Sequence, residues 1–135
     1  MAVIVVDTSA VIAYLRSEPE ATAVEQVLTG GDELAMSAVS AFEARIVLGA
    51  RFGPSVVQAL ELFLVRTAIE VHPFDDSQAQ MAHRAYLRFG KGTGHGASLN
   101  MGDCASYALA QSLSARLLYV GSDFAKTDVD AAMTP

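Results

Sequence analysis

The stretch AVIVVDTSAVIAYLRS, residues 2–17, determines how the rest of the chain must be arranged. Its first five residues are apolar and mostly β-branched without alternation, which is typical of a strand covered on both faces of a sheet. The run ends at Asp7, and the residues that follow have apolar side chains at helical spacing. A buried strand that passes through an acid directly into a helix predicts an α/β fold, with Asp7 at the carboxyl end of the strand.

The same alternation of strand and helix continues along the chain. Further strands are expected at 33–37, 69–74 and 116–120, with a short fifth strand at 127–132. Gly and Pro residues and candidate caps separate them from helices expected at 8–17, from Pro19 to about 29, from Ser37 or Ser40 to 52, at 55–68, at 75–89 and at 99–111. This order predicts a parallel sheet of four to five strands flanked by helices.

Composition limits the class of protein. The 135 residues fit one domain spanning 1–135, and 52% hydrophobic against 18% charged residues exclude disorder. No apolar run approaches the roughly 18 residues that a membrane helix needs, so we expect a soluble protein without membrane contact. The N-terminus has no secretory signal, and the single cysteine, Cys104, allows no internal disulfide. The cytoplasm is the expected compartment.

The net charge of −6 argues against a protein that simply coats nucleic acid. It does not exclude an RNA substrate, however, because some of the acids could bind a metal ion. Setting four of the 15 acids aside as metal ligands leaves 11 acids against nine Lys and Arg, so the remaining surface would be almost neutral.

Four acids are expected to meet at one edge of the sheet. Asp7 ends the first strand, and Asp123 follows the fourth. Glu43 lies early in the helix that leaves the second strand. Asp103 lies at the start of a helix that runs antiparallel to the fourth strand and so begins at that strand's carboxyl end. Ligands of parallel sheets bind beyond this edge, which makes these acids a candidate site.

Each acid also has a simpler explanation. Asp7 could cap the following helix, and Asp123 could form a turn. Ser40 with Glu43 has the form of a capping box, and Asn100 with Asp103 resembles one. Four caps have no reason to share one edge, however, and four unpaired carboxylates there would repel one another. Oxygen ligands without His or Cys favour Mg²⁺, or Mn²⁺, over zinc. Such an ion makes phosphodiester hydrolysis the natural chemistry, although these residues do not distinguish RNA from DNA.

Four stretches now carry a family resemblance: IVVDTSAVIAYL, SAVSAFEARIVLGARFG, LNMGDCASYALA and LLYVGSDFAKTDV. In this order, and over nearly the whole chain, they resemble a PIN-domain ribonuclease of the VapC toxin type. The resemblance implies a three-layer sandwich and a Mg²⁺-dependent endoribonuclease toxin. It also implies a homodimer that is restrained by a cognate VapB-like antitoxin. We expect the helices between residues 38 and 68 to form the dimer surface.

The resemblance also assigns roles to residues. Asp7 and Asp103 match the principal metal ligands, and Glu43 matches the acid that binds metal or positions the attacking water. Asp123 matches the fourth acid, which completes the pocket and could hold a second metal. Beside these four catalytic candidates, Thr8 and Ser122 are expected to support the ligands. Ser122 stands where the family commonly has Asn, and Met101 where an aromatic residue is frequent.

Contacts to RNA are less well defined by the sequence. Arg84, Arg88 and Lys91 fall opposite the apolar side of the helix at 75–89, where a solvated face is the commoner explanation of such residues. Arg45, two residues after Glu43, could contact RNA or form a salt bridge. The glycine-rich loop KGTGHGAS, residues 91–98, does not follow a strand and so does not match a dinucleotide-binding motif.

Two other function classes remain open. An aspartyl-phosphate phosphatase or receiver domain could use Asp7 as nucleophile, but Ser9 stands where the phosphatase signature has a second Asp. An inactive PIN-like binding module would be indicated by a missing acid, and all four acids are present.

Overall fold

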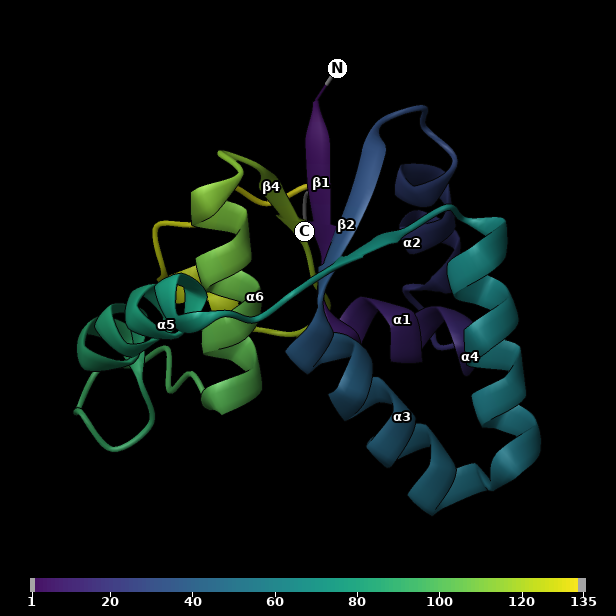
Figure 1. Ribbon diagram of the computed structural model, residues 1–135, viewed down its shortest axis with the longest axis horizontal. Coiled ribbons are helices and arrows are strands. Elements are labelled where there is room, and N and C mark those ends of the chain that lie inside the picture. The colour runs from purple at the N-terminus through teal and green to yellow at the C-terminus, as the bar shows by residue number, and fades with distance from the viewer. Residues whose placement is uncertain (1, 134–135) are drawn as a thin grey trace.

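The computed structural model describes residues 2–133 (Figure 1). The elements follow in the order β1 (Val3–Val6), α1 (Thr8–Leu15), α2 (Ala21–Leu28), β2 (Glu33–Ser37), α3 (Ala38–Phe52), α4 (Pro54–Arg66), β3 (Glu70–His72), α5 (Asp76–Phe89), α6 (Met101–Ser112), β4 (Arg116–Leu118) and the short 3₁₀ helix η1 (Phe124–Lys126). No helix in this part of the chain is long and apolar enough to cross a membrane.

The strands form one parallel sheet in the order β3-β2-β1-β4. Val5 of β1 is in register with Ala35 of β2 on one side and Leu117 of β4 on the other. Because the strands are parallel, all of their carboxyl ends reach the same edge of the sheet, as predicted.

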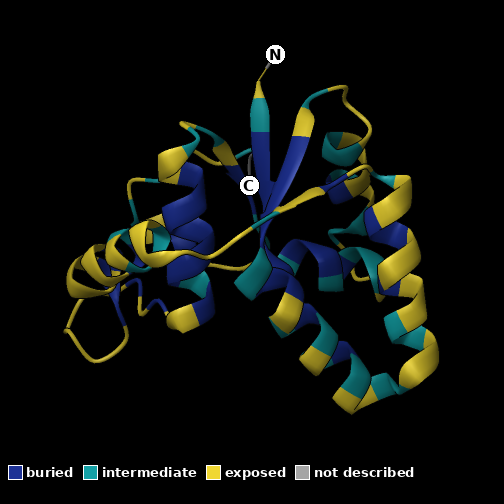
Figure 2. Ribbon diagram, in the orientation of Figure 1, coloured by how far each residue is buried: buried dark blue, intermediate teal, exposed yellow. Residues whose placement is uncertain are grey.

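Two separate clusters of buried side chains cover the two faces of the sheet. Ile4 and Val6 pack on one face against α1 to α4, while Val5, between them, packs on the other face against α5 and α6. In Figure 1 these two helical layers lie to the right and to the left of the strands, and Figure 2 shows that most of β1, β2 and α6 is buried, whereas β3 is largely exposed. The predicted three-layer α/β arrangement is confirmed, because every central strand has apolar residues on both faces.

The predicted fifth strand does not form, and the helix after β2 begins at the first of its two predicted starts. Residues 127–132 form no regular fifth strand: Ala131 makes an isolated bridge with Leu117, and Asp128 is bonded to the side chains of α5 and α6 instead. Ser40 does not open the helix after β2, because Ser37 caps it by accepting the N–H of Val39. The Ser40 capping box therefore does not form.

Glycine sets the angle between the two longest helices of the right-hand layer. Gly53 ends α3 and precedes α4, with φ of 84°, a left-handed conformation that strains other residues. Pro54 then occupies the first turn of α4, where no N–H is required. The chain thus turns back without a longer loop.

Candidate functional site

Asp7 lies at the carboxyl end of β1, caps α1 and is only 3% exposed. Ser9 donates two hydrogen bonds to Asp7 Oδ2, from its backbone N–H at 3.0 Å and from its hydroxyl at 2.7 Å. Ser106 on α6 donates its hydroxyl to Asp7 Oδ1 at 2.5 Å. A carboxylate has about four acceptor positions. Asp7 therefore keeps one free lone pair, on Oδ1, for a further ligand.

Hydroxyl groups tie Asp7 to three other elements. The Ser9 hydroxyl accepts the N–H of Val120 after β4 at 3.0 Å. The Ser106 hydroxyl lies 2.9 Å from that of Ser40 on α3, and both serines are fully buried. Thr8 donates to the backbone carbonyl of Ser40 at 3.0 Å. These bonds fix the carboxylate of Asp7 relative to α3, α6 and β4. Thr8 thus bonds to α3 and contacts no acid among the described hydrogen bonds, so its role in supporting the ligands stays a prediction.

The serines of this network were missed in the sequence, although two of them carry a signal. Ser9 stands two residues after an Asp, a spacing at which Asp side chains commonly bond the backbone. Ser106 lies three residues after Asp103 and therefore on the same side of the helix. Ser40 carries no such signal, because the pattern Ser-x-x-Glu predicts a cap.

Asp103 occupies the first turn of α6 and forms the predicted capping box with Asn100. The N–H of Asp103 donates to Asn100 Oδ1 at 2.8 Å, and the N–H of Asn100 donates to Asp103 Oδ2 at 3.0 Å. Glu43 on α3 directs its carboxylate at the same turn, because a Cβ atom added to Gly102 would lie 2.7 Å from Glu43 Oε1. A side chain at this position would displace the Glu43 carboxylate from the first turn of α6.

The charges of the four predicted acids act on one another. The pKa of Asp103 is raised from 3.8 to about 7: burial is the main cause, the hydrogen bond from Asn100 acts against it, and the negative charges of Asp7, Asp123 and Glu43 add to the rise. Asp123 is exposed, between β4 and η1. The structure therefore brings all four predicted acids to one edge of the sheet, close enough for their charges to interact.

These acids suit a hard divalent cation, because such a cation binds oxygen ligands. Its positive charge would also relieve the repulsion between the carboxylates. They are not already drawn around one point: within residues 2–133, no three His, Cys, Asp or Glu side chains form a ready-made metal cluster. A cation that binds all four would therefore have to draw these carboxylates closer together.

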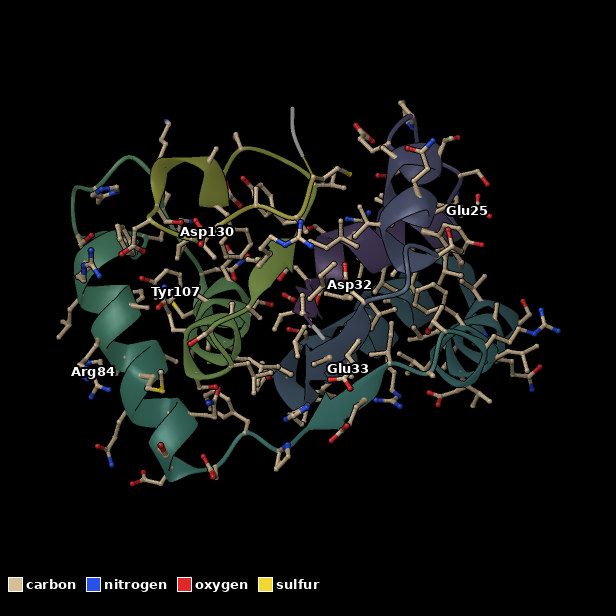
Figure 3. The ribbon with its side chains drawn as sticks, turned by 90° about the horizontal axis from the view of Figure 1, so that it is seen from above. Glu25, Asp32, Glu33, Arg84, Tyr107 and Asp130 are labelled. Carbon is tan, nitrogen blue, oxygen red and sulfur yellow. The ribbon has the colours of Figure 1, made fainter. Side chains whose placement is uncertain are left out.

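The other candidate side chains have different surroundings. Arg45 forms a salt bridge with Glu61 on α4, with 2.7 Å between Nε and Oε1. Arg88 pairs with Asp128 at 3.3 Å. Arg84 is exposed on α5 (Figure 3), beside a cavity of about 250 Å³ that Tyr107 also lines. These contacts favour the solvated-face interpretation of α5 and leave RNA contacts as predictions.

The remaining residues singled out in the sequence differ in exposure. Lys91 and Ser122 are exposed. Met101, the first residue of α6, is 82% exposed. Cys104 is buried, and its pKa is raised to about 11 by burial and by Asp103, as expected of a packing residue.

A cleft of about 450 Å³, with Asp32 and Glu33 on its wall (Figure 3), opens at the opposite edge of the sheet, away from the four acids.

Comparisons with known proteins agree with this architecture. The family model of the PIN domain matches residues 4–130. Ribonuclease VapC28 of Mycobacterium tuberculosis is 43% identical over 129 residues, which cover 96% of this chain and 97% of that protein. The solved structure of M. tuberculosis VapC20, described as a sarcin-ricin loop cleaving toxin, superposes with a TM-score of 0.80 at 15% identity, covering 97% and 99% of the two chains. VapBC2 from Rickettsia felis, solved with a DNA fragment from its promoter, gives a TM-score of 0.72 at 15% identity, covering 96% of each chain.

The match to the family model spans most of the chain, and the alignment to VapC28 spans nearly all of both proteins. The fold agrees as well, since the parallel sheet and its helices superpose on those of VapC20. The chain therefore belongs to the PIN-domain family, among the VapC ribonucleases.

Proposed function

We propose that this protein is a Mg²⁺-dependent endoribonuclease toxin that hydrolyses RNA phosphodiester bonds at the edge formed by Asp7, Glu43, Asp103 and Asp123. One observation carries the proposal: four carboxylates from four segments lie close enough for three of them to raise the pKa of the fourth. Proteins rarely gather like charges without a function for them. A ribonuclease relative at 43% identity supplies the substrate class.

Asp7 and Asp103 are the proposed principal ligands. The free lone pair on Asp7 Oδ1 favours a bond through a single oxygen, because Ser9 occupies both acceptor positions on Oδ2. Asp103 would bind through Oδ1, since its Oδ2 accepts the N–H of Asn100. When bound, Mg²⁺, or Mn²⁺ in its place, would polarise the phosphate and lower the pKa of an attacking water.

Glu43 and Asp123 complete the proposed site. Glu43 faces the first turn of α6 without a described hydrogen-bond partner, so its carboxylate is free to orient the water or to bind the cation. Asp123 is exposed beside this turn and would close the shell from the other side. The donor set consists of oxygen atoms throughout, which suits Mg²⁺ or Mn²⁺ better than zinc.

Partners follow from the same family membership. We propose a VapB-like antitoxin as the regulatory partner, since a chain of VapBC2 has the same fold as this protein. We also propose a cytoplasmic location, together with the RNA substrate. A homodimer is proposed as well. α3 and α4 expose large apolar side chains, which suits the predicted surface between residues 38 and 68; they are Phe42, Ile46, Leu62 and Val65.

Cleavage of total cellular RNA by the purified protein, with Mg²⁺ or with EDTA, tests the proposal. We expect cleavage only with the divalent ion, and loss of more than 100-fold in rate for Asp7→Asn and for Asp103→Asn. Asp130→Asn is the matched control, because this exposed acid lies outside the site. Metal-independent cleavage, or full activity of both site variants, would contradict the proposed site.

A further inference from the structure

Four of the nine cationic side chains of this acidic protein form ion pairs or stack on a ring. Within residues 2–133, Arg45, Arg88 and Arg116 form ion pairs with carboxylates, and Arg16 stacks on the ring of Phe52 at 3.6 Å. The remaining cations of the nine Lys and Arg are Arg51, Arg66, Arg84, Lys91 and Lys126. An RNA backbone that approaches the carboxylates needs a positive group near them, so the position of these five matters.

Lys126 is the cation that the fold joins most directly to the site. It lies three residues after Asp123, on the single turn of 3₁₀ helix η1, which the side chain of Phe124 anchors in the core at 3% exposure. Residues three apart on a 3₁₀ turn point to the same side. Lys126 therefore extends from the same side of η1 as the carboxylate of Asp123. The described residues show no ion pair between the two, so the ammonium is not used up by the site acid.

The loop that leads into α6 holds the side chain of Lys126. Its Nζ donates a long hydrogen bond of 3.4 Å to the carbonyl of Gly96, and a Cβ added to Gly96 would lie 3.4 Å from Lys126 Cδ. The lysine stem lies across the loop backbone at Gly96, four residues before the cap of α6 at Asn100. The ammonium is thus exposed beside the loop that leads into the helix carrying Asp103.

Other positive groups at this edge are less well placed. His95 accepts the N–H of Ala97 at its Nδ1, which requires that nitrogen to be unprotonated, and its ring packs edge-on against Phe89 at 5.1 Å. Lys91 donates its backbone N–H to the carbonyl of Leu99, directly before the cap of α6, but no described bond holds its ammonium. Neither residue therefore has a positively charged side-chain group that a described bond holds beside the acidic segments.

We propose that Lys126 is a positioning residue that binds a backbone phosphate of the RNA beside the phosphate to be cleaved. The inference rests on the proposed ribonuclease function and adds to it the first specific contact with substrate. An ammonium is a point charge that binds phosphate without reading the base. Lys126 would therefore contribute to affinity for RNA of any sequence and would leave the chemical step to the carboxylates.

The test compares wild type, Lys126→Ala and Lys126→Arg. Arg66→Ala is the control of equal charge, because Arg66 is exposed at the C-terminal end of α4, which faces the amino edge of the sheet. Cleavage of total cellular RNA with Mg²⁺ gives kcat and KM. Binding of the same RNA, end-labelled with a fluorophore and kept intact by EDTA, gives Kd at several salt concentrations.

We expect Lys126→Ala to raise KM about fivefold and to change kcat by less than about twofold, because the lost contact is equal in ground and transition states. The slope of log Kd against log salt should fall by about 0.7, the value for one phosphate contact on a single strand. Lys126→Arg should restore both values, and Arg66→Ala should match wild type.

Two results would overturn the proposal. One is a salt slope unchanged by Lys126→Ala, and the other is an equal effect of Lys126→Ala and Arg66→Ala. A wild-type protein that fails to cleave RNA with Mg²⁺ would instead defeat the proposed function. The binding series in EDTA would still decide the role of Lys126 in that case, since it requires no cleavage.

Discussion

Asp103→Asn should stabilise the metal-free protein at neutral and alkaline pH while abolishing cleavage. In the folded chain the carboxyl of Asp103 keeps its proton up to a pKa of about 7, whereas the unfolded chain loses it near the ordinary value of 3.8. The unfolded state is therefore favoured progressively as pH rises from about 4 to 7. Below pH 4 both states hold the proton, and the acid costs nothing.

The expected magnitude follows from this difference. At 1.36 kcal/mol for each pKa unit, moving from 3.8 to about 7 corresponds to about 4 kcal/mol. Asp103 is only partly buried, so we halve this to about 2 kcal/mol for screening by solvent. The variant also loses a negative charge at a helix N-terminus, which costs about 0.5 kcal/mol. Asn can still accept the N–H of Asn100, so a net gain of about 1 to 2 kcal/mol at pH 8 remains.

Urea unfolding followed by circular dichroism, in EDTA at pH 4 and pH 8, measures the effect. We expect the gain at pH 8 and little difference at pH 4, with Asp130→Asn within about 0.5 kcal/mol of wild type at both. Adding Mg²⁺ should stabilise wild type more than Asp103→Asn. A variant that is less stable than wild type at pH 8, or equally changed at both pH values, would refute the electrostatic argument.

Three more substitutions test the geometry around the site. Gly102→Ala should lower RNA cleavage at least tenfold, because its Cβ would displace the Glu43 carboxylate, while the free energy of unfolding should change by less than about 1 kcal/mol. Gly49→Ala on α3 is the control and should cleave normally. Normal cleavage by Gly102→Ala would show that Glu43 does not need to approach α6 this closely. Ser106→Ala should lower the free energy of unfolding in urea by about 1 to 3 kcal/mol, because buried Asp7 loses a hydrogen-bond donor. Ser112→Ala, at an exposed position on the same helix, should lower it by less than about 0.5 kcal/mol. Equal losses would contradict the hydroxyl network. Tyr107→Phe removes the hydrogen bond from the tyrosine hydroxyl to Asp128 and should loosen the C-terminal segment. Amide exchange of Leu117, whose N–H donates to the carbonyl of Asp130, should then accelerate several-fold, whereas Tyr86→Phe should leave it unchanged. An unchanged rate in Tyr107→Phe would show that this bond does not hold the segment.

Much of the fold was predictable because strand and helix periods differ clearly in this chain. The buried strand at 33–37 is confirmed residue for residue, and Asp7 does end a strand and cap a helix. The prediction of a fifth strand was wrong because residues 127–132 are held by side-chain hydrogen bonds and by one bridge to Leu117. The periodicity of the sequence does not indicate such contacts.

The acids of the site were predictable for a topological reason, since strand direction alone sends them to one edge. The groups that orient them were not. Whether Ser40 caps α3 or faces Ser106 depends on which residue begins the helix after β2, a difference of three positions. Arg45 meets Glu61 only because α3 and α4 fold back on each other at Gly53, and sequence spacing does not specify that packing.

The two edges of the sheet also bear on how copies of this chain can associate. Backbone bonds to Asp130 and Ala132 cover the outer side of β4. The other edge strand, β3, has only three residues, carries Glu70 and His72, and is followed at once by Pro73, which has no N–H to offer. Short, charged edges resist strand-to-strand joining between molecules. Even concentrated protein should therefore form discrete assemblies through its helices in preference to fibrils.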